Sequence, residues 1–513
     1  MEYDPVMRIE IYSHFFKILN PNPNVTRVIL MFSRRFSVCK DVGVKTNNRY
    51  AKEETKSQFT VFAYRSSDNS EFRFHVGQYE EFIQYLEFNH IAAHLYTVTK
   101  VGLYEPVKID VELNPSYELR DYQKEIVEFV SEEVADDNRS RLIALGTGLG
   151  KTLSSLAAIG TIKTRTLIVI LPTYIDQWAK EITKILNVKP KEIMVVKGSA
   201  QMEGLIGLGQ DGALKAKFII VSLPTFRNFL KNFEYNVNDY KPEDICKILG
   251  IGTIIIDETH QHLHGVYSVM MSIHVPRVIG LSATLMSDDP IVKKVQHCMF
   301  PKEIRFDKVK LDQYIKVYAI AYRFINFYKA NLRTTERGSN NYSHNAFEKS
   351  IMHNKEVLDK YLNFIAELIE KAYNKDYVKG DKLLIFASSI AMCTTITNYV
   401  KKEFPDFTVA RFVEDDPYEN MLNPDIRVST ILSCGTGKDI PNLRATIMTT
   451  SVSSSVSNIQ AIGRLRKLPD RDVKFYYIFC EQIPKHCQYH SSKKQLFHDR
   501  VASIKELKYP YGL

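Results

Sequence analysis

Short apolar runs alternate with longer amphipathic stretches through much of this chain. Five such runs lie within the first 281 residues, at residues 142–145, 167–171, 218–221, 254–256 and 278–281, and segments with helical periodicity separate them. Strands that are buried on both faces of a parallel sheet have this continuous apolar character, and helices supply the crossovers between them. The pattern predicts an α/β lobe.

A second series of apolar runs, at 383–386, 427–432, 446–448 and 475–479, predicts another parallel sheet, with one long helix over 347–372 ahead of it. The first 114 residues mix strand-like runs (28–32, 59–62 and 107–111) with a helical stretch at 78–88. We therefore expect two tandem α/β lobes after a small α+β domain. The expected boundaries are 1–114, 115–300, 301–490 and a C-terminal tail at 491–513.

Composition limits the possible classes of protein. The chain has 513 residues, of which 45% are hydrophobic and 25% charged, as in globular proteins. Lys and Arg exceed Asp and Glu by 68 − 59 = 9, which suits a polyanionic partner without requiring one. The seven cysteines include no Cys-x-x-Cys pair, and the first residues lack the stretches of a signal peptide. We expect a soluble intracellular protein with no membrane partner.

The strongest local signal is a glycine loop directly after the run at 142–145. Backbone N–H groups of such a loop converge on phosphate oxygens at the start of a helix. Lys151 would reach the β and γ phosphates, and the Thr152 hydroxyl would bind Mg²⁺. The strict pattern has glycine where Leu145 stands, so a plain glycine-rich turn is the alternative. The candidate phosphate-binding residues are Gly146, Thr147, Gly148, Leu149, Gly150, Lys151 and Thr152.

Two carboxylates follow the apolar run at 254–256. Asp257 could hold the Mg²⁺ ion, and Glu258 could polarise the water that attacks the γ-phosphate. An Asp-Glu pair after a strand also arises by chance. The glycine loop about a hundred residues earlier favours the catalytic interpretation.

Together these residues resemble superfamily 2 helicases, and further segments match in the family's order over roughly residues 115–485. The resemblance implies that Gln123 reads adenine, that Asp439 contributes to nucleotide binding, and that His260 completes a DExH box. It implies coupling roles for His260, Ser282, Thr284 and Gln460. It also implies nucleic-acid contacts by Pro172, Thr173, Pro224, Thr225 and Thr430.

The last motif, which begins at Gln460, departs from the family pattern Gln-x-x-Gly-Arg-x-x-Arg. In the family its arginines stabilise charge on the γ-phosphate from the second lobe. Lys467 stands where the second arginine belongs, and Arg466 precedes it. We expect Arg464 to act first and Arg466 second.

Within the superfamily, the chain looks similar to the XPB-like and UvsW-like branch, which includes DNA helicases of poxviruses and other large DNA viruses that act in transcript release. The resemblance implies ATP and Mg²⁺ as cofactors, DNA rather than RNA as the favoured partner, a transcription complex as a candidate partner, and host cytoplasm or virion if the chain is viral. An RNA helicase, a non-catalytic nucleic-acid-binding scaffold and a nuclease-linked translocase are the alternatives.

Three other features carry less weight. His486, Cys487 and His490 lack a second ligand pair, so no structural zinc is expected. Trp178 is expected only to pack its helix. The segment 34–36 with the aromatic residues Tyr64, Phe72 and Phe74 could form a stacking surface for nucleic acid, although aromatic residues on strands more often form a core.

Overall fold

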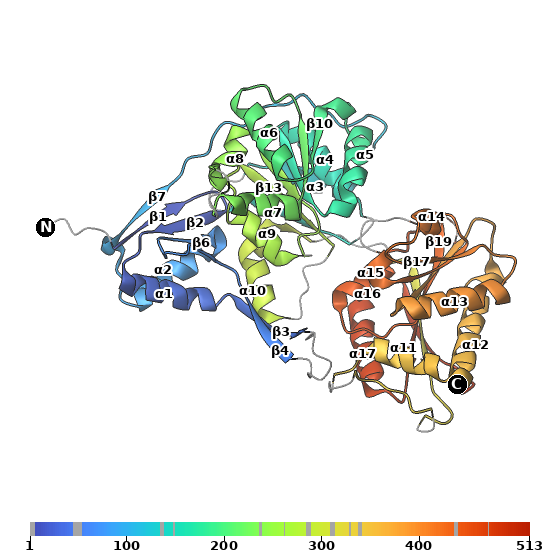
Figure 1. Ribbon diagram of the computed structural model, residues 1–513. Helices are drawn as coiled ribbons and strands as arrows, with labels where there is room; N and C mark the ends of the chain where they lie inside the picture. Colours follow the sequence, from blue (N-terminus) through green and yellow to red (C-terminus); the bar gives the residue numbers. More distant parts are fainter. Residues whose placement is uncertain are drawn as a thin grey trace. The chain divides into compact units, whose positions relative to one another are not determined.

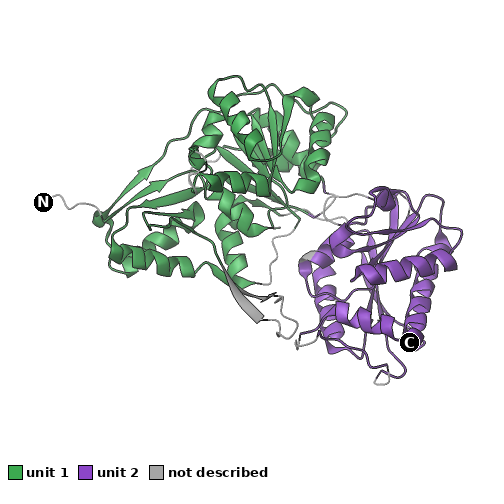
Figure 2. Ribbon diagram, viewed as in Figure 1, with its two compact units in different colours: residues 1–145, 150–309 green, residues 146–149, 310–513 purple. Residues whose placement is uncertain are grey.

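The computed structural model shows two compact units, residues 1–145 with 150–309 and residues 146–149 with 310–513 (Figures 1 and 2). It describes residues 6–44, 54–133, 138–146, 149–234, 237, 239–260, 262–283, 289–307, 313–327, 330–336, 341–434, 440–469 and 471–513. Each unit contains one seven-stranded parallel sheet, which confirms the prediction of two α/β lobes.

The first unit begins with a five-stranded sheet in the order β5-β6-β2-β1-β7. Only β1 and β7 run parallel. The strands are β1 Met7–Ile11, β2 Phe15–Leu19, β5 Tyr64–Arg65, β6 Glu71–His75 and β7 Tyr96–Lys100; a separate ribbon pairs β3 Ser37–Val44 with β4 Glu54–Val61. The predicted α+β character of this region is confirmed.

Two of the predicted strands in this region are wrong. Residues 28–32 lie in helix α1 (Pro23–Arg34), because Asn22 caps the helix and Pro23 occupies its first position. Its buried side chains, Val25, Ile29 and Phe32, have helical spacing. Residues 107–111 form no strand and contribute only an isolated bridge at Lys108. The predicted helix at 78–88 is α2 (Tyr79–Phe88).

The sheet of lobe 1 has the order β10-β11-β9-β12-β13-β8-β14, and every adjacent pair is parallel. All five predicted strands are present, and β10 and β14 extend the two edges. The strands are β8 Ser140–Ala144, β9 Thr166–Ile170, β10 Ile193–Val196, β11 Phe218–Ser222, β12 Thr253–Ile256, β13 Arg277–Ser282 and β14 Arg305–Phe306. Because β14 belongs to this sheet, lobe 1 extends past the expected boundary at residue 300.

Helices connect these strands, as parallel pairing requires. They are α3 Asp121–Ser131, α4 Lys151–Ile162, α5 Ile175–Ile185, α6 Ser199–Gln210, α7 Leu223–Asn232, α8 Pro242–Ile248, α9 Leu263–Met270 and α10 Pro290–Met299. α4 packs beside α3 and α5, and α7 packs beside α6 and α9.

The N-terminal sheet shares one hydrophobic core with lobe 1. That core contains Phe16 and Phe74 of the N-terminal sheet together with Val169 and Ile256 of the lobe 1 sheet. The backbones also approach closely, because a Cβ on Gly77 would lie 2.0 Å from the carbonyl oxygen of Cys298 in α10. The expected separate domain 1–114 is therefore continuous with lobe 1 in its packing.

Buried polar contacts cross the same boundary. Lys17 pairs with Glu243 of α8, and both side chains are almost wholly buried. The backbone N–H of Ser13 donates to Nδ1 of His274 over 3.2 Å. Because buried polar groups are costly when unpaired, these contacts fix the register of the two parts.

Lobe 2 repeats the parallel architecture in the order β17-β18-β16-β19-β20-β15-β21. Its strands are β15 Ile315–Tyr322, β16 Lys382–Ala387, β17 Val409–Phe412, β18 Ile426–Thr430, β19 Leu443–Met448, β20 Val473–Cys480 and β21 Ser503–Lys508. Both faces of this sheet are covered. In β16, Leu383 and Ile385 enter one core, whereas Leu384 and Phe386 enter another.

Several expectations for lobe 2 need correction. The single helix predicted over 347–372 is two helices, α11 His344–His353 and α12 Lys355–Ala372, because Asn354 caps the second one. The run at 427–432 leaves the sheet after Thr430, whose hydroxyl caps the short helix α15 (Ile431–Cys434). The other helices are α13 Ile390–Glu403, α14 Glu419–Leu422, α16 Ser455–Ile462 and α17 Pro484–Phe497.

The expected tail at 491–513 is part of lobe 2. α17 continues to Phe497, and β21 then pairs in parallel with β15 along the edge of the sheet. The last residue, Leu513, belongs to the lobe 2 core.

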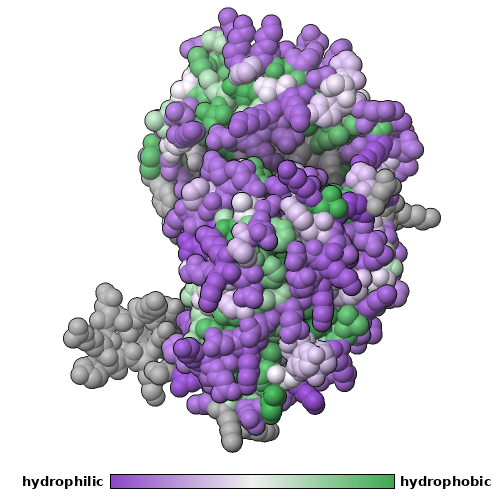
Figure 3. Space-filling model, turned by 90° about the vertical axis from the view of Figure 1, so that its right-hand side faces the viewer, coloured by the Kyte–Doolittle hydropathy of each residue, from purple (hydrophilic) through white to green (hydrophobic). Residues whose placement is uncertain are grey.

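Hydrophilic residues cover most of the face in Figure 3, and hydrophobic residues appear on it in small groups. Among the residues that the structure describes, no helix has the length and apolar character needed to cross a bilayer.

Candidate functional site

The predicted phosphate loop leads into α4, whose first residue is Lys151. Gly150 caps this helix with φ +73°, a left-handed conformation that favours glycine. A Cβ at this position would also lie 2.4 Å from Nε2 of Gln123. The buried amide of Gln123, predicted to read adenine, thus lies against the last glycine of the loop.

The ends of β8 and β13 and the start of α4 are tied together. Lys151 Nζ donates to the carbonyl oxygen of Leu145 over 3.1 Å, and the backbone N–H of Leu145 donates to the carbonyl oxygen of Ser282 over 3.1 Å. The side chain of Leu145, which occupies the glycine position of the strict pattern, is buried. Thr152 follows Lys151 in the first turn of α4.

Asp257 stands at the end of β12 with both carboxylate oxygens occupied. Oδ1 accepts the backbone N–H of Glu258 over 2.8 Å, and Oδ2 accepts the indole N–H of Trp178 over 3.0 Å. Burial raises the pKa of Asp257, and the charge of Lys151 opposes that rise. The Lys151 charge is therefore electrostatically linked to the carboxylate predicted to bind the metal ion.

Glu258 and His260 form a buried pair beside β13. Glu258 adopts φ +51°, and its Oε2 lies 3.3 Å from Nδ1 of His260. The same nitrogen lies 2.9 Å from the hydroxyl oxygen of Ser282. Burial lowers the pKa of His260 to about 4, with a further contribution from Lys151, so the imidazole is neutral near pH 7. The structure thus brings together Glu258, His260 and Ser282 from two neighbouring strands.

The predicted nucleic-acid contacts of lobe 1 lie at the carboxyl ends of β9 and β11. Pro172 and Thr173 are exposed in the short helix η3 (Pro172–Tyr174), and Pro224 is exposed at the start of α7. Ser222 caps α7, because its hydroxyl oxygen accepts the backbone N–H of Thr225 over 3.2 Å. These positions are available to a ligand at that edge of the sheet.

The predicted residues of lobe 2 are less exposed. Thr430 is buried and donates its hydroxyl to Ser433 over 2.8 Å. Gln460 is half-buried in α16. Arg464 is 4% exposed, whereas the half-buried guanidinium of Arg466 donates to the carbonyl oxygens of Gly463 and Leu465. The two arginines therefore have different environments.

Four of the predicted site residues lie outside the described residues. These are Thr147 and Gly148 of the glycine loop, Thr284 after β13, and Asp439 after α15.

Comparison with known proteins finds similarity to helicases. Residues 116–287 match the family described as "Type III restriction enzyme, res subunit". The "General transcription and DNA repair factor IIH helicase/translocase subunit XPB" of Schizosaccharomyces pombe is 24% identical over 409 residues, which cover 76% of this chain and 46% of the relative. The chain is thus similar in sequence to an XPB helicase/translocase subunit.

Two further XPB relatives match shorter segments. The "TFIIH basal transcription factor complex helicase/translocase XPB subunit" of Trypanosoma brucei brucei is 28% identical over 200 residues, 38% of this chain and 20% of the relative. The "DNA 3'-5' translocase XPB2" of Sulfurisphaera tokodaii is 32% identical over 175 residues, 34% and 32% of the two chains. The chain thus spans less than half the length of each of these relatives.

Two solved helicase structures also align with the chain. The Hef helicase domain of Pyrococcus furiosus has a TM-score of 0.45 at 17% identity, covering 73% of this chain and 98% of that one. T4 UvsW has a TM-score of 0.35 at 14% identity, covering 98% and 99%.

Trp178 of lobe 1 is a functional candidate that the sequence interpretation missed. It was expected only to pack its helix, and it is indeed buried, but its indole N–H also bonds Asp257. The sequence offered two signals for it. Trp178 is the only tryptophan of the chain, and it lies five residues after Thr173.

The less favoured features of the sequence have structural explanations. Phe36, Phe72 and Phe74 are buried in the core, so they form no stacking surface. The ring of His486 accepts the backbone N–H of Cys480 over 3.0 Å and packs against His344. Among the described residues, no cluster of three or more His, Cys, Asp or Glu side chains could hold a metal ion.

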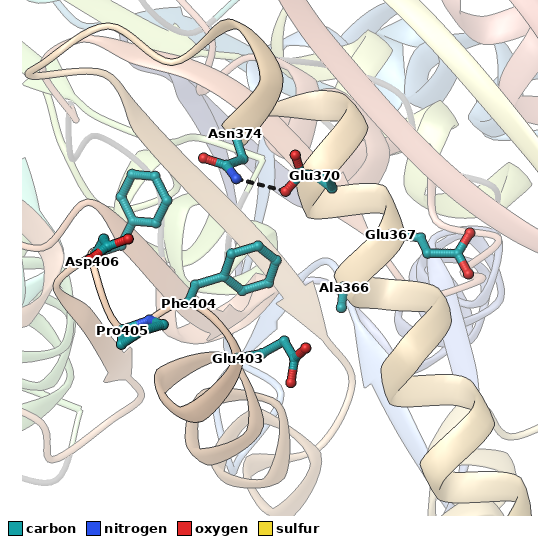
Figure 4. Close-up of a pocket in the computed structure, with 9 residues that line it drawn as sticks. Ala366, Glu367, Glu370, Asn374, Glu403, Phe404, Pro405 and Asp406 are labelled. Atoms are coloured by element: carbon teal, nitrogen blue, oxygen red, sulfur yellow. Dashed lines mark hydrogen bonds between the residues drawn. The ribbon is translucent and has the colours of Figure 1, made fainter.

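A cavity of about 410 Å³ lies apart from all predicted site residues, between the C-terminal ends of α12 and α13 (Figure 4). Glu370 accepts a hydrogen bond from Asn374 over 2.6 Å at its edge. The cavity is lined by Ala366, Glu367, Glu370, Asn374, Glu403, Phe404, Pro405, Asp406 and Phe407. The carboxylates make it unsuitable for ATP, which is itself an anion.

Proposed function

We propose that this chain is an ATP-dependent DNA translocase or helicase that couples ATP hydrolysis to movement along nucleic acid. The observation that carries the proposal is the cluster at the carboxyl edge of the lobe 1 sheet. Asp257, Glu258 and His260 follow β12, beside Ser282 at the end of β13 and Lys151 at the start of α4. Ligands of open α/β sheets bind at this edge.

The residues present fit a Mg²⁺–ATP complex. Lys151 would hold the β and γ phosphates at the start of α4, and Gly146 to Gly150 would supply backbone N–H groups. The Thr152 hydroxyl and an Asp257 oxygen are hard oxygen donors of the kind that Mg²⁺ prefers. When bound, the ion would neutralise charge on the phosphate oxygens. Gln123 and Asp439 are proposed to contact the nucleotide.

Glu258 is the proposed general base. Its carboxylate would accept the proton of the attacking water, and the neutral His260 would orient it while contacting Ser282. The proposed coupling residues, which would link changes at this site to changes elsewhere in the protein, are Ser282, Thr284 and Gln460. Arg464, and secondarily Arg466, would stabilise negative charge that develops on the γ-phosphate.

DNA is favoured as the polymer because the matched relatives are named as DNA repair factors and a DNA translocase. Exposed Pro172, Thr173 and Pro224 would follow its backbone, together with Thr225 and Thr430. A transcription complex is the proposed protein partner, by analogy with the TFIIH subunits among the relatives.

Steady-state ATP hydrolysis should be measured with duplex DNA, single-stranded DNA and RNA of matched length, and strand displacement should be followed in parallel. We expect duplex or branched DNA to stimulate hydrolysis most. Stimulation by RNA alone would favour an RNA helicase, and the absence of any hydrolysis would favour a binding scaffold.

A further inference from the structure

Trp178 joins the proposed nucleic-acid face to the proposed metal carboxylate. It lies in the first turn of α5, directly after η3, which carries the exposed Pro172 and Thr173. Its own side chain is 2% exposed and points inward. Its indole N–H donates to Asp257 Oδ2 over 3.0 Å.

We propose that Trp178 is a positioning residue that transmits occupancy of the nucleic-acid face to the metal-binding carboxylate of Asp257. The proposal rests on the function proposed above, and it names how that function is regulated. Binding of a DNA backbone at η3 would shift the first turn of α5, and the indole would then change the orientation of the carboxylate.

The backbone of Asp257 is held independently of this contact. Its N–H donates to the carbonyl oxygen of Val169 over 3.2 Å, and the preceding residue, Ile256, pairs with Val169 in the sheet. A small movement of α5 would therefore leave the main chain of Asp257 in place. Two hydrogen-bond donors reach the oxygens of its side chain, and the charge of Lys151 also acts on it.

These two donors respond differently to such a movement. The backbone N–H of Glu258 is one residue away on the same strand end, so its bond to Oδ1 is local. The indole comes from a helix 79 residues earlier in the chain. Of these two hydrogen bonds, only the one to Oδ2 therefore depends on the position of α5.

The buried face of α5 makes the helix a suitable transmitter. Trp178, Ile182 and Ile185 follow one another at helical spacing and are all buried, whereas Asp176 and Gln177 are exposed. A force applied at η3 would reach Asp257 through one packed element, without any need for a longer path.

Trp178 is the only tryptophan in the chain, so its fluorescence reports this contact directly. We expect the emission of the full-length protein to change when duplex DNA is added without nucleotide. It should change again when Mg²⁺ and the non-hydrolysable analogue AMPPNP are added. An emission spectrum that responds to neither addition would overturn the proposal, even if no variant can be purified.

The matched variants are Trp178→Phe, which keeps an aromatic ring but removes the N–H, and Ile182→Val, which loosens the same helix face without touching Asp257. Hydrolysis is measured against Mg²⁺ concentration with and without duplex DNA. For Trp178→Phe we expect the half-saturating Mg²⁺ concentration to rise roughly tenfold, the size of one hydrogen bond to a charged acceptor. The ratio of DNA-stimulated to basal hydrolysis should fall several-fold.

Ile182→Val should keep both values, which separates loss of the N–H from loss of packing. If Trp178→Phe keeps the wild-type Mg²⁺ dependence and stimulation ratio, the proposal is wrong. If the wild-type protein itself hydrolyses no ATP with any nucleic acid, the proposed function fails instead, so the two failures are distinguishable.

Discussion

The carboxyl edges of the two parallel sheets differ in chemistry although their topologies correspond. In lobe 1, Asp257 and Glu258 directly follow β12, and Lys151 begins α4 after β8. In lobe 2, β18 ends at the buried Thr430, whose hydroxyl bonds Ser433, and β19 leads to the buried Thr449, whose hydroxyl donates to the carbonyl oxygen of Phe386 over 2.8 Å.

The same strand order therefore carries two different sets of side chains at its carboxyl edge. Carboxylates and a lysine make the lobe 1 edge suited to a metal–nucleotide complex, whereas the hydroxyls at the lobe 2 edge cap helices and fix loops. The charged candidates of lobe 2, Arg464 and Arg466, come from the segment after α16. Hydrolysis should therefore respond to changes in the two lobes in different ways.

The largest effect is expected at Lys151. Lys151→Ala should reduce ATP hydrolysis by about a thousandfold or more, because the β and γ phosphates lose their cation. Phosphate release measures the effect. Lys124→Ala, an exposed lysine on α3, is the matched control and should hydrolyse ATP at the normal rate. Equal loss in both variants would contradict the role of Lys151.

Glu258→Gln should separate binding from chemistry. We expect kcat to fall roughly a hundred- to a thousandfold, as for loss of a general base, while a fluorescent ATP analogue still binds. Glu128→Gln alters an exposed glutamate on α3 and serves as its control. Loss of analogue binding in Glu258→Gln alone would mean that this residue holds the nucleotide rather than the water.

The two arginines of lobe 2 should be unequal. Arg464→Ala is expected to lower kcat about a hundredfold with little change in KM, because stabilisation of developing charge appears only in the transition state. Arg466→Ala should have a smaller effect, since its guanidinium already bonds main-chain carbonyls. Lys402→Ala, which changes an exposed lysine on α13, is the control. A larger effect at Arg466 would reverse the expected order.

The buried Lys17–Glu243 pair should affect stability more than hydrolysis. Lys17→Met leaves Glu243 as an uncompensated buried charge, which typically costs about 3–5 kcal/mol. The double variant Lys17→Met with Glu243→Gln should recover much of that loss. Urea unfolding of the three proteins measures it, and a single variant as stable as the wild type would show that the pair is open to solvent.

Acid should destabilise lobe 1 with its N-terminal sheet. Burial lowers the pKa values of His14 and His75 to about 3, far below the value of about 6.5 in an unfolded chain. The unfolded state therefore binds more protons below pH 6.5, and the free energy of unfolding falls by up to about 1.4 kcal/mol per pH unit for each histidine.

Urea unfolding between pH 7.5 and 5 measures this slope. A His14→Asn variant should show a shallower dependence, because it removes one of the histidines whose pKa is lowered by burial. An unchanged slope would place the acid sensitivity elsewhere.

The sequence predicted the sheets and the carboxylate cluster because both are local. The apolar runs at 254–256 and 278–281 are strands, and Asp257 and Glu258 follow the first of them directly. The Trp178–Asp257 bond joins residues 79 positions apart, so no local pattern could show it. Similarly, β21 is mostly polar and exposed, and only its pairing with β15 makes it a strand.

The N-terminal region was predicted least well for the same reason. Residues 28–32 are apolar enough for a strand, yet the cap at Asn22 and the packing of Ile29 and Phe32 make them helical. Its burial against lobe 1 depends on pairs such as Lys17 and Glu243, which are 226 residues apart.

The close packing of the backbone at Gly77 limits how the N-terminal sheet can move. The backbone of η1 (Val76–Gln78) touches the carbonyl oxygen of Cys298 so closely that no side chain fits between them. The N-terminal sheet therefore cannot swing about this point like a tethered module. Any ligand bound to the N-terminal sheet would therefore move together with lobe 1.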